Sequence, residues 1–435
     1  MKMNSIGLCK KFFFFVLLPN ILAAQGRSLQ ELELNRIKNV RYDFNIPSAR
    51  SIGMGGAFIA IANDATAGEA NAAGLTQLWW PRVSLHYKYK RFRHEELAGT
   101  ALDPDLTAEF RDDVVSQSFL SVILPDTARH FFFSFYRQEL INFARSFSYE
   151  HFVPKDSTRG KGAPGIISQT EILVVDWAAA VAYRLSNGFS IGLTLRSSNL
   201  RFRFIEEVYE DIADTTSPQG NIPRNLALLT QTDDTDRSFG VNISAMYKIT
   251  GPPLNFGVIY KTGAKFDVFT SLLAPSREGM RQNLLRNAMS IRRIAPFRIP
   301  TSFGFGIALG PINNWVFSFD AIRIHYTDLL KDQGEFIKDA KLTIDNGYQF
   351  HFGVERFLRL FDRLVVARAG MFREPNSKIY TLSSDPDLQR LFPRHSAQYH
   401  FTGGFGLNFS KISLDFALHA SKEIFEVLFS SGISI

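Results

Sequence analysis

The chain has 435 residues, with 49 Lys and Arg against 42 Asp and Glu, a formal net charge of +7 and 45% hydrophobic residues, among them 41 Phe. This nearly balanced charge gives no reason to expect a nucleic-acid partner. The only cysteine is Cys9, so the chain beyond it can form neither a disulfide framework nor a cysteine metal site. After the first 24 residues no apolar run reaches the length of a membrane-spanning helix.

Residues 1–24 have the features of a secretory signal peptide. Lys2, Lys10 and Lys11 form a positive start, residues 12–18 form an apolar core, and Ala23-Ala24 supplies small residues for cleavage. We therefore expect an exported protein. Removal of the three lysines lowers its net charge from +7 to +4.

Residues 48–75 are rich in glycine and alanine. Glycines 53, 55 and 56 allow close backbone packing or a positive φ. An apolar run at 57–62 follows, and Asn63-Asp64-Ala65 reads as a turn. Such a segment is expected to be enclosed by the rest of the chain.

From residue 82 onward, apolar and polar residues alternate with period two, which predicts strands with one apolar face. The hairpin around Ser410-Lys411 tests the register, because a two-residue turn places Leu407 opposite Leu414 and Phe405 opposite Phe416. In residues 189–204 the apolar phase slips by one position, which predicts a β-bulge.

Connections of two lengths join the predicted strands. Long polar loops at 95–115, 154–169, 207–236, 271–298, 330–345 and 374–396 alternate with tight links such as Pro125–Ala128 and Ser186–Gly188. The predicted strands are 82–94, 116–124, 129–153, 170–184, 189–206, 237–249, 254–270, 299–309, 315–329, 346–357, 363–373, 397–409, 412–420 and 424–435.

An even strand number with long and short connections in alternation is typical of an outer-membrane β-barrel. A spanning sheet must close, because lipid offers no hydrogen-bond partners to the backbone. The sequence thus predicts an all-β fold, a transmembrane antiparallel barrel of about 14 strands, with both termini on the periplasmic side. A soluble β-sandwich is the alternative; it does not explain the alternation of loop lengths.

The stretch from Ala49 to Ala67, followed by Asn71-Ala72-Ala73-Gly74-Leu75, resembles the N-terminal region of FadL/TodX-type outer-membrane transporters. Segments 300–306 and 315–326 resemble later hairpins of the same superfamily. The resemblance implies three parts: a signal peptide at 1–24, an N-terminal extension and hatch at 25–81, and a barrel at 82–435. The family signature has proline where this chain has Ala72.

The resemblance also implies passive uptake of long-chain fatty acids or other hydrophobic molecules, with sideways release through the barrel wall. Its implied hatch and gating residues are Gly53, Gly55, Gly56, Asn71, Ala72, Ala73 and Gly74. Simple close packing without motion is the alternative role for them. PorV-type secretion components share the front motif, so a docking or shuttle role for exported proteins is the alternative function. The acidic residues Asp211, Asp214, Asp233, Asp234 and Asp236 in the predicted loop 207–236 suit such a docking surface.

An acidic hydrophobic ligand would need a cation in the lumen. Lys88, Lys90, Arg196 and Arg368 fall on the polar phase of their strands and are the candidate ligand-binding residues, with solvated lumen charge as the alternative. The predicted loop 271–298 is a second candidate region, for lipopolysaccharide or a carboxylate. Its apolar residues are Leu272, Leu273, Met280, Leu284 and Leu285, and its cations are Arg277, Arg281, Arg286, Arg292 and Arg293.

Motifs of enzymes and cofactors are weak. Gly53-Met54-Gly55-Gly56 lacks the spacing of a dinucleotide fingerprint, and His94-Glu95-Glu96 lacks the second histidine of a zinc-protease helix. His395 and His400 bracket a predicted loop without acids at ligand spacing. We therefore expect no catalytic residue, no cofactor and no metal.

Overall fold

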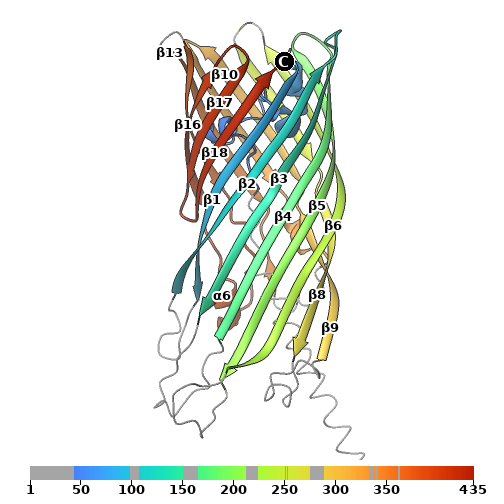
Figure 1. Ribbon diagram of the computed structural model, residues 1–435, viewed down its shortest axis with the longest axis vertical. Coiled ribbons are helices and arrows are strands. Elements are labelled where there is room, and N and C mark those ends of the chain that lie inside the picture. Colours follow the sequence, from blue (N-terminus) through green and yellow to red (C-terminus); the bar gives the residue numbers. More distant parts are fainter. Residues whose placement is uncertain are drawn as a thin grey trace, which may run out of the picture.

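The computed structural model describes residues 44–97, 107–149, 165–211, 224–249, 251, 253–274, 289–332, 338, 341–360 and 363–435. It is a tall barrel with tight turns at one end and long connections at the other (Figure 1). The wall segments are β1 (Arg82–Leu97), β2 (Thr107–Pro125), β3 (Phe131–Tyr149), β4 (Gly165–Arg184), β5 (Phe189–Asp211), β6 (Arg224–Ile249), β7 (Leu254–Lys261), β8 (Ala264–Ala274), β9 (Met289–Ile299), β10 (Ser302–Ile312), β11 (Trp315–Ile324), β13 (Gly347–Leu360), β14 (Arg363–Glu374), β16 (Gln398–Asn408), β17 (Ile412–Ala420) and β18 (Ile424–Ser434).

The sheet is antiparallel and closed. Pairing of β1 with β18, from Arg82 opposite Ser434 to Phe92 opposite Ile424, joins the first strand to the last. Segments β7 and β8 both pair with β6 and form one barrel strand interrupted at 262–263; β9 and β10 form another, interrupted at 300–301. The predicted 14-stranded antiparallel barrel is confirmed.

The predicted hairpin register is also confirmed. Phe405 lies opposite Phe416 and Leu407 opposite Leu414, and the Phe409 amide donates to the Ile412 carbonyl at 2.8 Å. Within the described part of the chain no helix is long and apolar enough to cross a membrane.

The bulge predicted within residues 189–204 is wrong, because β5 keeps one register against β4 across this stretch. Near the tight turns, Leu193 and Leu195 face outward and are exposed, whereas Thr194 faces inward. Beyond residue 198 the same inward phase carries apolar residues, with Phe202 and Phe204 fully buried. The phase slip therefore marks an inversion of the two faces along a continuous strand.

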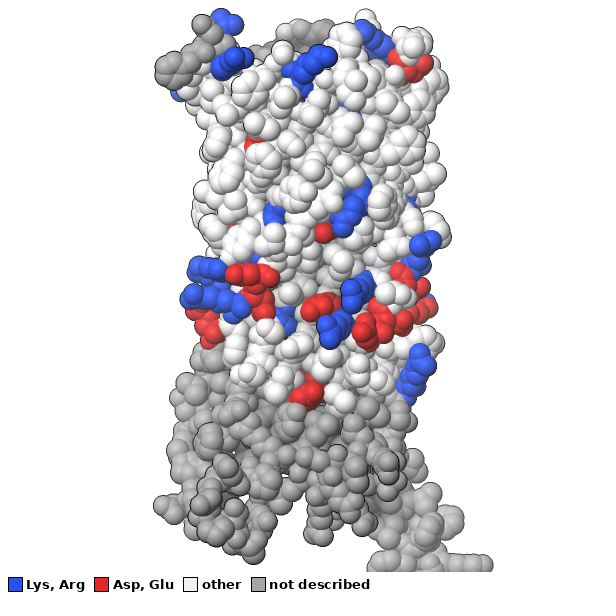
Figure 2. Space-filling view, in the orientation of Figure 1, with Lys and Arg blue, Asp and Glu red and all other residues white. Residues whose placement is uncertain are grey.

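The inversion recurs around the barrel. Its inward apolar residues form one buried cluster, which we name the apolar collar: Phe92, Ile141, Phe143, Ile172, Val174, Leu200, Phe202, Phe204, Phe266, Val268, Phe297, Ile299, Ile324 and Ile424. The outer surface changes at a corresponding height. Figure 2 shows a largely uncharged band toward the tight turns and a belt of mixed Lys, Arg, Asp and Glu side chains beyond it.

Several predicted loops are wrong, because strands continue past the apolar band. Most of 207–236 belongs to β5 and β6, so Asp211 ends β5 and Asp233, Asp234 and Asp236 lie within β6. Likewise Leu272 and Leu273 lie in β8, and Arg292 and Arg293 in β9. The other residues predicted there, Asp214, Arg277, Met280, Arg281, Leu284, Leu285 and Arg286, fall outside the described residues, as do the predicted signal peptide and Cys9.

The predicted strand 315–329 ends early, at Ile324. The chain then forms the 3₁₀ helix η3 (Tyr326–Leu330), whose Tyr326 and Leu329 are buried against the apolar collar. A small sheet of β12 (Leu342–Thr343) and β15 (Tyr380–Thr381), with the helix α6 (Pro386–Leu391), lies in the connections at this end.

The N-terminal segment, defined here as residues 44–80, lies inside the barrel toward the tight turns (Figure 1). It contains α2 (Ala49–Gly53), α3 (Ala67–Ala70) and the 3₁₀ helix η1 (Ala72–Gln77). Ser48 caps α2 through its hydroxyl, and the Asn71 side chain caps η1. Small side chains let these short helices pack directly on the inner wall.

Candidate functional site

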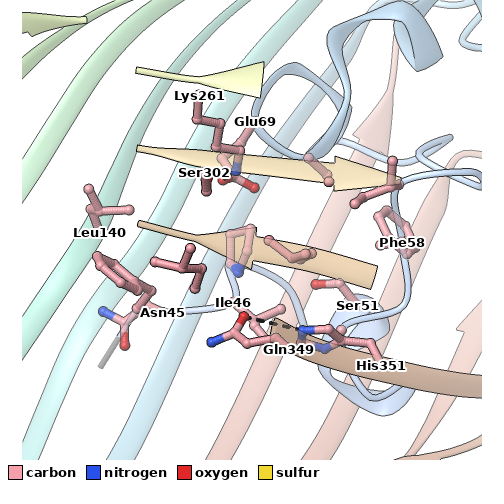
Figure 3. A pocket seen from close by; sticks show the side chains of 18 of the residues that line it. Asn45, Ile46, Ser51, Phe58, Glu69, Leu140, Lys261, Ser302, Gln349 and His351 are labelled. Carbon is pink, nitrogen blue, oxygen red and sulfur yellow. Dashed lines mark hydrogen bonds and ion pairs between the residues drawn. The ribbon is translucent and has the colours of Figure 1, made fainter. Parts of the chain in front are cut away.

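A cavity of about 190 Å³ lies between the N-terminal segment and the inner wall. Its apolar lining includes Ile46, Phe58, Ile59, Leu140, Ile259, Ile299, Ile322, Ile324 and Phe372. Ile299 and Ile324 also belong to the apolar collar, so the two apolar surfaces are continuous. Figure 3 shows side chains from the N-terminal segment and from several strands around the space.

Polar groups at two places around the cavity are already paired. Lys261 of β7 forms an ion pair with Glu69 of the N-terminal segment. The His351 ring contacts the Gly55 carbonyl through Nδ1 at 2.7 Å and Gln349 through Nε2 at 3.4 Å (Figure 3). These groups are therefore satisfied by the protein.

Asp320 of β11 fixes the part of the N-terminal segment that borders the cavity. Its Oδ2 accepts the backbone amides of Phe58 at 2.6 Å and Ile59 at 2.8 Å. Asn71 holds the same turn, donating to the Ile59 carbonyl at 2.9 Å and to the Ala245 carbonyl at 3.2 Å. A buried carboxylate that accepts two amides orders this backbone strongly.

A buried ionic network attaches α2 to the adjoining part of the wall, at β13, β14 and β17. Arg50 makes two hydrogen bonds to the Glu355 carboxylate, each of 3.0 Å. Arg368 donates to Glu355 and to Asp415, each at 2.6 Å, so Glu355 lies between two guanidinium groups. Burial makes this network costly to disrupt, because removing one partner leaves an uncompensated charge.

All four predicted ligand-binding cations are buried and face inward. Lys90 and Arg196 line the cavity. Lys90 donates to Asn45 at 3.3 Å, and Arg196 contacts Asp176 at 3.3 Å and donates to the Thr262 carbonyl at 2.5 Å. Lys88 lies 3.7 Å from Glu139 and Arg368 belongs to the buried ionic network, and neither lines the cavity. A ligand role stays a prediction for all four.

The predicted hatch residues lie within the N-terminal segment and pack against the wall. Gly55 and Gly56 have positive φ of 61° and 76°. A β-carbon on Gly55 would lie 2.5 Å from the Phe352 carbonyl oxygen, and one on Gly74 would collide with the Ala62 backbone. Gly53 packs on Arg368, and Ala72 and Ala73 pack on Gly192. These positions require small residues for close approach, whether or not the segment moves.

Sequence reasoning missed a row of titratable side chains along the cavity wall. His400 lies in β16 rather than beside a loop, and its Nδ1 is 2.8 Å from Nε2 of His419. His419 Nδ1 is 3.0 Å from Glu426, and His400 Nε2 is 3.3 Å from Glu374. Two neutral imidazoles supply two protons for these three contacts, so hydrogen bonds at all three require one additional proton. Their position on the polar phase of adjacent strands was the available signal.

The wall beside the cavity contains a seam, which we define as the stretch where 234–238 of β6 faces 265–269 of β8. Here side chains replace part of the backbone ladder. The amides of Lys265, Asp267 and Phe269 donate to the side chains of Ser238 (3.2 Å), Asp236 (2.7 Å) and Asp234 (2.8 Å). Thr262, next to the seam, lines the cavity.

No protein-family model and no curated protein matches the chain. Among solved structures, a FadL homologue from Pseudomonas aeruginosa aligns with a TM-score of 0.61 at 13% identity, over 90% of this chain and 99% of the other. The fold is that of the FadL-type channels. The monoaromatic hydrocarbon channel CymD (TM-score 0.54, 16% identity, 90% and 99% coverage) and the Ralstonia pickettii toluene transporter TbuX (0.55, 12%, 91% and 99%) share the FadL-type architecture.

Proposed function

We propose that the protein is a bacterial outer-membrane channel for passive uptake of small hydrophobic molecules. The observation that carries this proposal is the inversion of the wall, which places an apolar collar inside the lumen and leads it into a cavity bordered by the N-terminal segment. Transfer of an apolar solute from water to such a surface is favourable, by roughly 25 cal/mol per Å² of apolar surface buried. In this orientation the long connections face outside and both termini lie in the periplasm.

The N-terminal segment serves in this proposal as the hatch. Asp320 holds its backbone at Phe58 and Ile59, and the buried ionic network holds α2. Gly53, Gly55, Gly56, Asn71, Ala72, Ala73 and Gly74 provide its close contacts with the wall. Movement of the hatch would need only a local change, because its helices are short and separated by turns.

The size of the cavity favours a compact guest. A dry cavity of about 150 Å³ accommodates benzene, and the space here is about 190 Å³. A single-ring hydrocarbon therefore fits the cavity alone, whereas a long-chain fatty acid would extend its chain along the apolar collar. Lys90 or Arg196 would then receive its carboxylate.

The seam supplies the sideways exit in this proposal. Its end near the tight turns lies beside Thr262 and the exposed Phe239, at the border of the uncharged outer band. Separation of β6 from β8 there breaks side-chain contacts rather than a full backbone ladder, which lowers the cost of opening.

Uptake by whole cells tests the proposal. Bacteria with an intact outer membrane and without a FadL-type transporter of their own would receive the gene, and entry of labelled toluene and labelled oleate would be compared with that in vector-only cells. Saturable, protein-dependent entry of at least one of them is expected. If neither enters while gel mobility shows a folded barrel, the uptake function is wrong and the PorV-like docking hypothesis replaces it.

Cross-linking tests the exit. The chain beyond Cys9 has no cysteine, so the pair Arg237→Cys and Lys265→Cys, both exposed on the outer face, can be joined across the seam by a short bismaleimide. The matched control joins Arg201→Cys to Thr235→Cys, which face each other across the regular β5–β6 ladder. Uptake should fall only when the seam is joined; equal uptake after both cross-links would contradict the seam as the exit.

A further inference from the structure

Three cations gather at the rim that carries the tight turns. They are Arg129 in the turn between β2 and β3, Arg184 at the end of β4, and Lys248 near the end of β6. Among the described residues no carboxylate lies within ion-pair distance of any of them, although Asp126 shares the turn with Arg129. Within the described part of the chain, the charges at this corner of the rim are therefore not neutralised by an ion pair.

Trp79 brings two of these cations together. The guanidinium carbons of Arg129 and Arg184 lie 4.7 Å and 4.6 Å from the centre of its indole ring. The two guanidinium carbons therefore lie at most about 9.3 Å apart. Two like charges this near repel each other, and the indole faces offset only part of that repulsion. An anion bound between the two guanidinium groups would offset the remaining repulsion.

The N-terminal segment keeps these cations in place. Arg184 donates through Nη2 to the Thr76 carbonyl, and Lys248 donates through Nζ to Gln77 at 2.5 Å. Arg184 also lies over the Phe132 ring at 5.1 Å. Side chains held by such contacts are preorganised, so a ligand loses little free energy in ordering them.

The surroundings are apolar on the side that faces outward. Trp79 and Trp80 are 45% and 64% exposed, and Phe131, Phe133 and Phe189 on the neighbouring strands are exposed as well. The arrangement of an arginine over an aromatic ring recurs at the same end of the wall, with Arg356 over Trp315 at 4.7 Å and Arg363 over Phe409 at 5.5 Å. Exposed tryptophan beside arginine at the end of an apolar band is typical of the headgroup level of a membrane.

We propose that Arg129, Arg184 and Lys248 around Trp79 form a binding site for the phosphate headgroup of an anionic phospholipid. Guanidinium groups match phosphate oxygens in geometry and charge. The acyl chains lie along the exposed phenylalanines of β3 and β5. An anionic lipid is preferred over a zwitterionic one, because a choline or ethanolamine group would return a positive charge to an already cationic corner.

Native mass spectrometry of the detergent-released protein tests this site, because it counts single bound lipids. Phosphatidylglycerol is expected to form a one-to-one adduct roughly tenfold stronger than phosphatidylcholine with the same acyl chains. In the double variant Arg129→Gln, Arg184→Gln that preference should disappear. Equal binding of the two lipids by the native protein, or an unchanged preference in the variant, would overturn the proposal.

Two further variants distinguish loss of the lipid site from misfolding and from a general loss of positive charge. Arg129→Gln alone removes no side-chain hydrogen bond of the N-terminal segment, and it should still weaken the adduct severalfold if Arg184→Gln disturbs folding. The matched control Arg201→Gln, Arg237→Gln removes two positive charges from the charged belt at the other end of the barrel, and it should leave the lipid adduct unchanged. If the control weakens the adduct as much as the double variant at the rim, general charge attraction explains the binding and the proposed site is wrong. Competition by inorganic phosphate as strong as by the lipid would contradict the assignment to a lipid.

Discussion

The half of the barrel near the tight turns and the half near the long connections arrange the same kinds of side chain in opposite ways. In the first half, Leu193 and Leu195 face outward while Thr194 and Arg196 face a lumen filled by the N-terminal segment. In the second half, Phe202 and Phe204 face inward and charged residues face outward. The strand is continuous through both.

The difference follows from what surrounds each half. An outward apolar face is stable where lipid surrounds the wall, and a polar interior there needs paired charges and hydrogen bonds such as the Glu355 network. Where water surrounds the wall, charged residues face outward, and the interior is free to be apolar. This second interior is the one that suits a hydrophobic guest. The predictions below test the assignment of the two halves.

The largest effect is expected from Glu355→Gln in the first half. The change leaves Arg50 and Arg368 without their shared carboxylate, and loss of one partner of a buried pair typically costs about 3–5 kcal/mol. Urea unfolding of the purified barrel measures it. Glu171→Gln in the second half removes an exposed partner of Arg203 at 4.0 Å and should cost less than about 1 kcal/mol. Similar losses of unfolding free energy in the two variants would contradict the proposed difference between the two halves.

The second largest effect is expected from an arginine placed on the outer face, which should destabilise the barrel in the first half but not in the second. Leu193→Arg places a cation in the uncharged outer band and should reduce stability in lipid by about 2–4 kcal/mol. Thr235→Arg, on the exposed outer face of β6 in the other half, should have almost no effect. Unfolding in lipid vesicles, followed by gel mobility, compares them. A tolerated arginine at 193 would mean that lipid does not surround that height.

A smaller effect is expected on transport when the collar becomes polar. Ile324→Ser removes apolar surface at a position that belongs both to the apolar collar and to the cavity lining, and it should lower saturable uptake by about fivefold, because roughly 1 kcal/mol of apolar contact with the guest is lost. Phe401→Ser removes a phenylalanine of β16 that faces outward, far from the seam, and should leave uptake near the native value. Whole-cell uptake, corrected for the amount of folded barrel, gives the comparison. Equal losses would show that the collar is not on the route.

The smallest effect should distinguish ligand classes. Lys90→Met keeps the apolar stem of this cavity-lining side chain but removes its charge, so uptake of oleate should fall about threefold while uptake of toluene stays unchanged. Competition between the two ligands in one assay makes the difference visible. A parallel fall in both would assign Lys90 a structural role through Asn45.

The sequence predicted the strand number and the 405–416 register because period-two alternation is strong where one face meets lipid. It failed where that condition ends. Loops were predicted at 207–236 and 271–298 because strands in water need no apolar face, and the inversion near Ser198 was mistaken for a bulge. The inward direction of Lys90 and Arg196 followed from the same alternation. Their partners, and the contacts along the row from Glu374 to Glu426, depend on the register between neighbouring strands and on side-chain rotamers, which the alternation alone does not encode.

A crystal structure with iodobenzene would test the central claim most directly, because anomalous scattering locates iodine without ambiguity. An iodine peak inside the cavity, among Phe58, Ile259 and Ile324, is the predicted result. The outer wall offers a competing apolar groove near Trp177 and Phe239. Iodine in that outer groove with an empty cavity would contradict the account.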